Sequence, residues 1–228
     1  MAFGPHPDDV ELGMGGTLAR QSGLGHATAI IDLTRGEMGS NGTPAERLAE
    51  GEAAAHILGC RWRRNLALPD RGLDYRDPGQ MRTVVEAIRQ VRPAVAFVNW
   101  GADRHPDHRA AHQLMQEALF NAGLRRYETG QEPYRPAKVL YYFINDEQEP
   151  SFYVDITPVY PQKIESLFAH VSQFRPAEGA VATRLNGPAG LPYLIESRDR
   201  LFGARAGVSF AEGFLTTQAR LVSDLMSL

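Results

Sequence analysis

Short apolar runs alternate with longer amphipathic segments along the first two thirds of the chain. The apolar runs predict buried strands at residues 2–4, 27–33, 65–68, 94–100 and 139–145. The amphipathic segments predict helices near residues 14–24, 44–59, 78–91 and 107–123. This alternation is typical of a parallel sheet with helices on both faces, and strands that are apolar throughout are typical of a sheet buried on both sides. We therefore expect an α/β fold with a mostly parallel central sheet.

Two of these helices have clear ends. Thr43, Pro44 and Glu46 have the spacing of a capping box with proline at the first helical position. The helix from Asp107 ends at Gly123. Its apolar residues recur on one stripe: Ala111, Leu114, Met115, Ala118, Leu119 and Ala122. We expect that stripe to face the sheet.

The last third of the chain has a different pattern. It predicts a strand at 152–156, a helix capped at Thr157 and Pro158 that runs to about Val171, a helix at 193–206 and an extended segment at 208–210. Gly, Ala and Pro are frequent at 176–192, which predicts a plain loop, with a lid as the alternative. No linker or repeat divides the chain, so we expect a single domain over residues 1–228.

Composition and charge exclude several classes of protein. The 228 residues include 24 basic and 27 acidic side chains, a net charge of −3, so no global positive field favours nucleic acid as a partner. The one cysteine, Cys60, excludes a disulfide framework and a cysteine-rich zinc site. No apolar run is long enough to span a membrane, and the first residues have neither a basic start nor an apolar signal core. We expect a cytoplasmic protein.

Two loops that follow predicted strands carry side chains that bind metal ions. They are His6-Pro7-Asp8-Asp9-Val10-Glu11 and Asp103-Arg104-His105-Pro106-Asp107-His108. A zinc ion that catalyses hydrolysis needs about three protein ligands and one open position for water. His6 and Asp9 can chelate from one tight turn, and His108 can supply the third ligand, since sites of open α/β sheets form at the carboxyl ends of strands.

Three further residues of these loops can assist the chemistry. Asp8, next to a ligand but not itself a ligand, can take a proton from the metal-bound water. His105 can face the substrate and, when protonated, stabilise an oxyanion or protonate a leaving amine. Asp107 can fix the tautomer of His105. Taken singly, Asp8, Asp9 and Asp107 are more often helix caps. It is the pairing of two His-Pro-Asp loops that favours a metal site.

The remaining histidines and an early glycine cluster have simpler interpretations. We expect His26, His56, His112 and His170 to be surface or hydrogen-bonded residues. The sequence Gly13-Met14-Gly15-Gly16 invites a phosphate-loop interpretation, but Leu18 occupies the third glycine position of the dinucleotide fingerprint and no lysine is near. We expect these glycines to let a helix approach the sheet closely.

At residues 6–9 together with 105–108, the sequence resembles the LmbE-like, or PIG-L, family of zinc-dependent N-acetylglucosaminyl deacetylases. Segments spread over most of the chain resemble the branch that deacetylates N-acetylglucosaminyl L-malate in bacillithiol biosynthesis. These are residues 33–43, 68–72, 103–108, 141–145, 172–174 and 211–214. The resemblance implies a Rossmann-like fold and, because relatives often form trimers or hexamers, a homo-oligomer.

The resemblance also implies roles for individual residues. His6, Asp9 and His108 would hold Zn2+, or another divalent metal such as Fe2+ in the cell. Asp8 would be the general base, and His105 its protonated partner, oriented by Asp107. The arginine that the family places near the substrate falls at Arg47, although a helix arginine is by itself usually a solvated surface residue. Since malate carries two carboxylates, the candidate substrate-binding residues are Arg35, Arg47, Arg71 and Arg104.

The function that follows is hydrolysis of the N-acetyl group of an N-acetylglucosaminyl conjugate by attack of a zinc-bound water. Either His105 or the protonated Asp8 can donate the proton that the leaving amine needs. Within the same class, the alternatives are another acetylated aminosugar or a bacillithiol S-conjugate. From other classes, the alternatives are a non-catalytic α/β module that binds a sugar or nucleotide, and a nuclease or phosphatase, which usually has more carboxylates.

Overall fold

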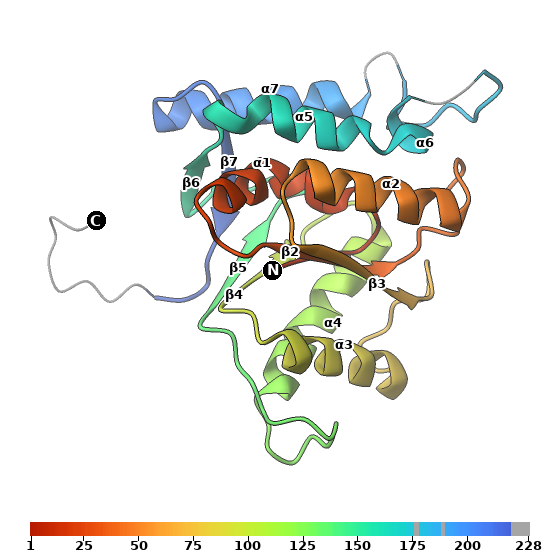
Figure 1. Cartoon of the computed structure of the whole chain (residues 1–228), viewed down its shortest axis with the longest axis vertical. Helices are drawn as coiled ribbons and strands as arrows, with labels where there is room; N and C mark the ends of the chain where they lie inside the picture. The colour runs from red at the N-terminus through yellow and green to blue at the C-terminus, as the bar shows by residue number, and fades with distance from the viewer. Residues whose placement is uncertain (176–177, 188–189, 220–228) are drawn as a thin grey trace, which may run out of the picture.

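A seven-stranded sheet forms the centre of the computed structural model, which describes residues 1–175, 178–187 and 190–219 (Figure 1). The strands are β1 (Ala2–Gly4), β2 (Ala29–Thr34), β3 (Trp62–Leu68), β4 (Val95–Asn99), β5 (Lys138–Tyr142), β6 (Phe152–Asp155) and β7 (Ala211–Leu215). Their order across the sheet is β3-β2-β1-β4-β5-β7-β6. The first five strands pair in parallel, and β7 is antiparallel to both β5 and β6.

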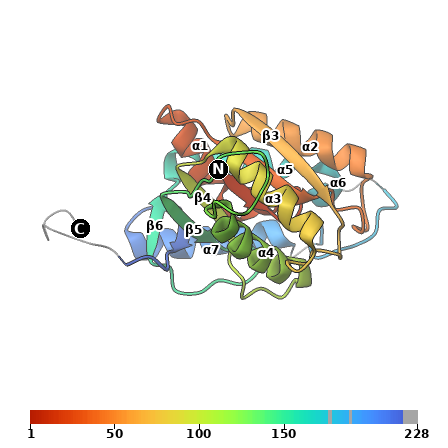
Figure 2. The same ribbon diagram turned by 90° about the horizontal axis from the view of Figure 1, so that it is seen from below.

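Helices cover both faces of this sheet. They are α1 (Asp9–Gly23), α2 (Pro44–Ile57), α3 (Pro78–Val91), α4 (Pro106–Ala122), α5 (Tyr160–Phe168), α6 (Val171–Phe174) and α7 (Leu191–Ala206), with a short 3-10 turn at Thr157–Val159. On one face lie α3 and α4, which are seen in front of the sheet in Figure 2. On the other face lie α1 and α2, and α5 and α7 form a further layer beyond them (Figure 1). The predicted α/β fold with a mostly parallel central sheet is therefore confirmed.

Within the described part of the chain, no helix combines the length and apolar character that crossing a lipid bilayer would require.

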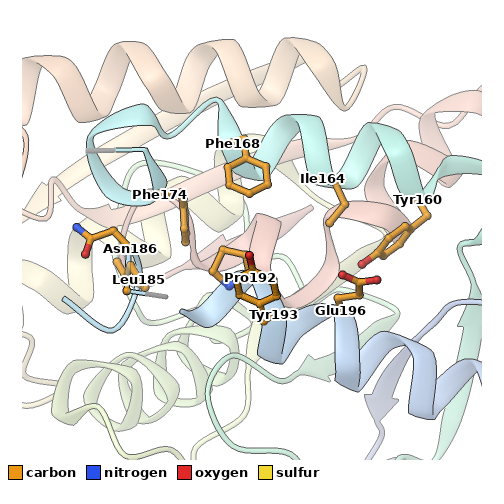
Figure 3. Close-up of a pocket in the computed structure, with 10 residues that line it drawn as sticks. Tyr160, Ile164, Phe168, Phe174, Leu185, Asn186, Pro192, Tyr193 and Glu196 are labelled. Carbon is orange, nitrogen blue, oxygen red and sulfur yellow. The ribbon is translucent and has the colours of Figure 1, made fainter. Parts of the chain in front are cut away.

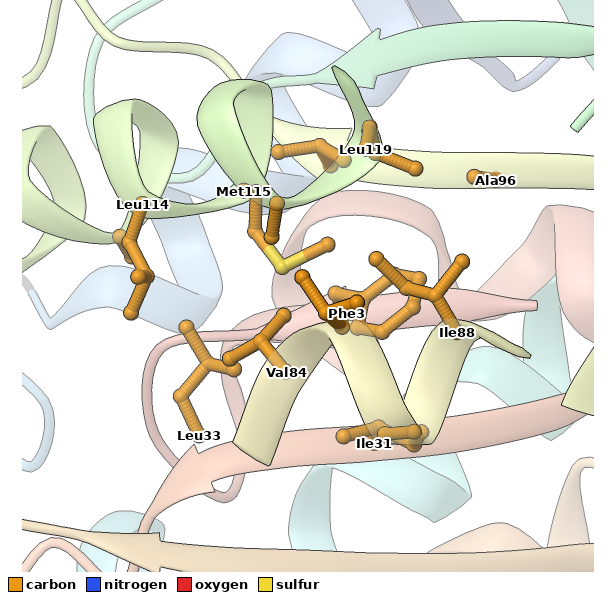
Figure 4. Packing of buried hydrophobic residues seen from close by; sticks show 14 of the residues in the cluster. Phe3, Ile31, Leu33, Val84, Ile88, Ala96, Leu114, Met115 and Leu119 are labelled. Carbon is orange, nitrogen blue, oxygen red and sulfur yellow. The ribbon is translucent and has the colours of Figure 1, made fainter. Parts of the chain in front are cut away.

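The largest apolar cluster lies between the sheet and the pair α3 and α4 (Figure 4). From the sheet, Phe3 and Ile31 point into it, and Val84 and Ile88 come from α3. The stripe predicted on α4 is buried at every position: Ala111, Leu114, Met115, Ala118, Leu119 and Ala122. Burial of this stripe sets the rotation of α4 about its axis, and this rotation turns His108, one turn earlier, toward the sheet.

Several predicted boundaries are wrong by a few residues. α1 begins at Asp9 rather than near residue 14, because Met14 (φ −154°) interrupts the helix and hides its first turn from the periodic pattern. β3 begins at Trp62 rather than Asn65, since Arg63 is polar in sequence but buried against the carboxylate of Asp32. β5 ends at Tyr142, which leaves residues 143–145 free to turn toward the site.

The end of the chain differs more from the prediction. Thr157 caps no helix, because its hydroxyl exchanges two hydrogen bonds with the backbone of Phe210. The single helix expected to Val171 is instead divided into the 3-10 turn, α5 and α6. The extended segment expected at 208–210 precedes a strand, β7, that begins at Ala211. Of the loop predicted at 176–192, residues 178–187 form turns and loop, and residues 176–177 and 188–189 lie outside the described residues. Residues 191 and 192 belong to α7, so this helix begins two residues earlier than predicted.

Gly13 lets α1 pack closely against β5, as predicted for this glycine cluster. A Cβ at Gly13 would overlap the ring of Tyr142 and lie 2.7 Å from the carbonyl oxygen of Phe143. Tyr142 is held by a hydrogen bond from its hydroxyl to the Phe3 carbonyl oxygen (2.8 Å), so it has little freedom to move.

We therefore expect Gly13→Ala to lower the free energy of unfolding by about 1–3 kcal/mol or more. Gly23→Ala, at the other end of the same helix, has nothing within 4 Å of the new methyl group and provides the matched control. It is expected to change stability by less than about 1 kcal/mol, in the stabilising direction. Urea denaturation of both variants tests the expectation, and equal stabilities would refute the packing argument.

Candidate functional site

The two His-Pro-Asp loops meet at the carboxyl ends of β1 and β4. These strands are neighbours at the centre of the sheet, but α1 and α4, which follow them, lie on opposite faces. Such a reversal of strand order leaves a crevice at the carboxyl ends of the strands, where α/β proteins bind ligands. A pocket of about 630 Å³ opens there. The two loops, although about a hundred residues apart in sequence, therefore line one pocket.

Asp9 links the two histidines that were predicted with it as metal ligands. Its Oδ2 lies 3.1 Å from Nδ1 of His6 and 3.3 Å from Nε2 of His108. The ring of His105 is close as well, with its centroid 4.6 Å from that of His108 and 5.0 Å from that of His6. One nitrogen from each of the three histidines falls within a single 4.8 Å group. The structure thus brings together His6, Asp9 and His108, and places His105 beside them.

A second set of polar residues, to which the sequence analysis assigned no role, supports these histidines. Asp103 Oδ2 lies 3.0 Å from His108 Nδ1, and Asn145 donates hydrogen bonds to Asp103. Asp70 Oδ1 lies 3.1 Å from His6 Nε2. Carboxylates behind a metal-binding histidine orient its ring and raise its basicity. Asp70 could have been found from its position directly after β3, at the same edge of the sheet.

The charges of the cluster fit a divalent cation. Burial lowers the pKa of His108, but the Asp9 and Asp103 carboxylates outweigh burial and raise this pKa to about 9. Burial likewise opposes a charged Asp9, yet His108 and His6 hold the pKa of Asp9 well below its ordinary value. The buried carboxylates of Asp9 and Asp103 thus lie against the imidazoles of the cluster, and a bound cation would offset the negative charge of these carboxylates. Nitrogen and oxygen donors of this kind suit zinc and other divalent transition metals.

Asp8 lies beside this cluster and does not act as a cap. It occupies the position before α1, but its side chain makes no capping hydrogen bond, and its φ of 123° is unusual for a residue with a side chain. Its Oδ2 accepts a hydrogen bond from Arg47 (3.3 Å). Burial raises the pKa of Asp8 to about 6, although Arg47 opposes the shift. A carboxylate with a raised pKa can both take up and return a proton near neutral pH.

Arg47 is a buried residue of the site rather than a solvated helix residue. The predicted capping box at Thr43 and Glu46 is present and places it in the first turn of α2. Its guanidinium also donates to the carbonyl oxygens of Pro7 (2.7 Å) and Gly36 (3.0 Å). Arg47 therefore ties together the loops that follow β1 and β2.

The relation between His105 and Asp107 differs from the prediction. The carboxylate of Asp107 contacts His6 Nε2 (3.4 Å) and accepts from the backbone N–H of Arg71 (2.8 Å), and not from His105. The backbone N–H of Asp107 instead donates to His105 Nδ1 (3.2 Å), which leaves the ring proton of the neutral imidazole on Nε2. Burial, with the neighbouring His108 and His6, lowers the pKa of His105, which favours the neutral form of the ring.

The other candidate arginines are placed unequally. Arg71 and Arg104 line the pocket. Arg35 is exposed and is not among the residues that line the pocket. Arg184, which was not predicted, does line it, together with Gln173 and Asn145. No sequence signal marks Arg184, because it lies in a loop rich in Gly, Ala and Pro.

The histidines outside the two loops follow the simple interpretation with one exception. His26 and His56 are exposed, and Nδ1 of His112 is 2.9 Å from the carbonyl oxygen of Asn99. His170 is wholly buried, and within the described part of the chain neither of its ring nitrogens has a hydrogen-bond partner. Its Nε2 lies 3.4 Å from Glu11 Oε1, so His170 is not a surface residue and its polar contact is this long ion pair with a buried carboxylate.

Comparisons with known proteins agree with this geometry. Residues 1–119 match the family described as PIG-L, GlcNAc-PI de-N-acetylase. Diacetylchitobiose deacetylase of Thermococcus kodakarensis is 31% identical, over 75% of this chain and 68% of the relative. A Bacillus anthracis protein described as "Probable N-acetyl-alpha-D-glucosaminyl L-malate deacetylase 2" is 30% identical, over 75% of this chain and 79% of the relative.

A solved structure extends the likeness to nearly the whole chain. The conserved protein TT1542 from Thermus thermophilus is 41% identical and superposes with a TM-score of 0.88, over 98% of this chain and 96% of its own. Fold, pocket and sequence similarity therefore agree, and the chain belongs to the LmbE-like, or PIG-L, family of deacetylases.

Proposed function

We propose that the protein is a zinc-dependent hydrolase that removes the N-acetyl group from an N-acetylglucosaminyl conjugate, with N-acetylglucosaminyl L-malate as the favoured substrate. The observation that carries the proposal is the cluster of His6, Asp9 and His108, with the buried Asp8 beside it at the floor of a pocket. A module that only binds a sugar has no use for a carboxylate of raised pKa next to a metal site.

In this proposal His6, Asp9 and His108 hold the ion, and Asp103 and Asp70 orient the two imidazoles from behind. A bound zinc ion would lower the pKa of a water molecule and polarise the acetamide carbonyl. Asp8 accepts the proton of the attacking water, and Arg47 keeps its carboxylate aimed at the pocket. His105 donates a hydrogen bond from Nε2 to the carbonyl oxygen as negative charge develops there.

The amine must be protonated before the C–N bond breaks, because an amide anion is a poor leaving group. Asp8 then holds the proton taken from water. With its pKa raised to about 6, Asp8 can both keep this proton and pass it to the amine near neutral pH. Since the pKa of His105 is lowered and its Nδ1 is an acceptor, we assign the proton donation to Asp8.

The malate conjugate is favoured for two reasons. One relative of this chain is described as a probable deacetylase of that compound. Arginines also line the pocket outside the metal cluster, where a dicarboxylate aglycone needs cationic contacts. Another relative is described as a diacetylchitobiose deacetylase, so a neutral acetylated sugar is the alternative substrate.

Acetate release tests the proposal. We expect release from N-acetylglucosaminyl L-malate to be much faster than from free N-acetylglucosamine, because the free sugar lacks the carboxylates. Treatment with a chelator should abolish release, and Zn2+ should restore it; Fe2+ added in parallel identifies the better ion. Release that survives complete removal of metal would refute the metal mechanism, and equal rates with both sugars would refute the choice of substrate.

A further inference from the structure

Residues 178–187, which we call the strap, form part of the pocket wall. Thr183, Arg184 and Leu185 line the same pocket as His6 and Asp8. The strap has its own hydrogen bonds: Asn186 accepts from the Thr183 backbone N–H (2.8 Å) and donates to the Val181 carbonyl oxygen (3.1 Å). It also bonds to the start of α7, where the Leu191 backbone N–H donates to the Arg184 carbonyl oxygen (2.9 Å). The strap is therefore an organised turn.

A pair of hydrogen bonds joins the strap to the loop after β2. The Asn41 side chain donates to the Val181 carbonyl oxygen (2.9 Å) and accepts from the Val181 backbone N–H (3.0 Å). Gln173 in turn donates to the Asn41 carbonyl oxygen (2.8 Å). An amide side chain that pairs with a backbone in both directions fixes the orientation of that backbone. Asn41 thus sets the position of the strap relative to the loop that Arg47 holds through Gly36.

The strap has a second anchor on its other side. Leu185 and Asn186 form one wall of an aromatic pocket of about 480 Å³ between α5 and α7, opposite Phe168 and Tyr160 (Figure 3). Leu185 lines this pocket and the active-site pocket as well. It packs against the apolar cluster on the α1 side of the sheet. Arg184 is thus held between an apolar anchor and the Asn41 contact.

The charges of the pocket are divided between floor and wall. The carboxylates of Asp8, Asp9 and Asp70 lie with the histidines. The wall contributes guanidinium groups, and within residues 1–175, 178–187 and 190–219 that of Arg184 has no carboxylate oxygen within 4.0 Å. The side chain of Arg184 is exposed to solvent at this wall. A guanidinium that lines the pocket without an acidic partner is available to bind an anion, and its planar fork matches a carboxylate.

We propose that the strap selects the substrate, and that Arg184, positioned by the Asn41–Val181 hydrogen bonds, binds an anionic group on the aglycone of the acetylated sugar. This inference rests on the proposed function for the identity of the sugar. Arg184 takes no part in bond cleavage. It raises the affinity for the substrate by binding the part that lies away from the metal cluster.

The test compares an anionic and a neutral substrate. We expect Arg184→Gln to lower kcat/KM for N-acetylglucosaminyl L-malate by about 10–100-fold, mainly through KM, which is the loss expected for a hydrogen bond to a charged group. For methyl N-acetylglucosaminide, the change should be under threefold, roughly the scatter of near-neutral substitutions. Asn41→Ala should act in the same direction, and the double variant should lose little more than Arg184→Gln alone. Arg125→Gln, at an exposed arginine outside the pocket, is the control.

Three outcomes would overturn the inference. An equal loss of kcat/KM with both substrates would make Arg184 a structural residue. No loss with either substrate would show that Arg184 does not contact the substrate. Additive losses in the double variant would show that Asn41 does not act through Arg184. If the wild-type protein releases acetate from neither sugar, the proposed function fails, and calorimetric binding of N-acetylglucosaminyl L-malate decides the inference by itself. Binding that weakens tenfold or more in Arg184→Gln would support it, and unchanged or undetectable binding would overturn it.

Discussion

Replacement of Asp8 by Asn is expected to lower kcat by about 10²–10⁴-fold, the contribution of a positioned general base. The substitution keeps the size of the side chain and an oxygen that accepts from Arg47, so the pocket should retain its shape. What it removes is the ability to take a proton from water and return it to the amine. KM should change little, because Asp8 acts on the water rather than on the sugar.

Metal content is the control that separates a base from a ligand. The contacts that join His6 and His108 run through Asp9 and do not include Asp8. Asp8→Asn should therefore bind zinc with the stoichiometry of the wild-type protein. Elemental analysis of the purified variant, followed by acetate-release kinetics, provides both readouts. Near-normal turnover would show that Asp8 is not the base, and loss of zinc would show that it is a ligand.

Removal of His108, in contrast, should weaken metal binding. Loss of an outer partner alone commonly costs roughly 10–100-fold in metal affinity, so loss of a ligand in His108→Ala should cost at least roughly 100-fold. Activity should fall together with the metal content, because no metal ion would then polarise the acetamide carbonyl. The variant would also leave the buried carboxylates Asp9 and Asp103 without the imidazole that now neutralises them.

His112 offers a matched control on the same helix. It lies one turn after His108, is half-buried, and has its Nδ1 2.9 Å from the Asn99 carbonyl oxygen, outside the residues that line the pocket. His112→Ala should therefore keep the bound metal, although it loses a hydrogen bond. Comparison of zinc content and thermal stability in the two variants tests the ligand assignment. Equal zinc content in both would exclude His108 from the ligand set.

The periodic patterns were sufficient to predict most of the fold. The strand–helix alternation and the stripe on α4 depend on burial, which leaves a regular trace in the sequence because every second or every third and fourth residue faces the core. The boundaries failed where a polar residue is buried for a tertiary reason. Arg63 in β3 is satisfied by Asp32 on the next strand, and Thr157 is bonded to Phe210, and neither partner is near in sequence.

The candidate site divides in the same way. The two His-Pro-Asp loops were visible because metal ligands come from few residue types and because each loop directly follows a strand. The hydrogen bond from the Asp107 backbone to His105 Nδ1 and the contact of the Asp107 carboxylate with Arg71 were not visible, since both depend on which groups surround these side chains. The burial of Arg47 was also contrary to the usual expectation for a helix arginine.

By itself, then, the sequence determined the α/β class, the parallel strands and the two loops that meet at their carboxyl ends, because these follow from local periodicity and from residues next to strand ends. Only the tertiary structure decided which side chains surround those loops. Arg47, Gln173 and Arg184 come from three separate segments outside those loops and line the pocket, and Arg47 and Gln173 are held there by hydrogen bonds to distant partners. Such contacts leave no local pattern, since the free energy that favours them depends on the assembled sheet and helices and not on the neighbouring residues in the chain.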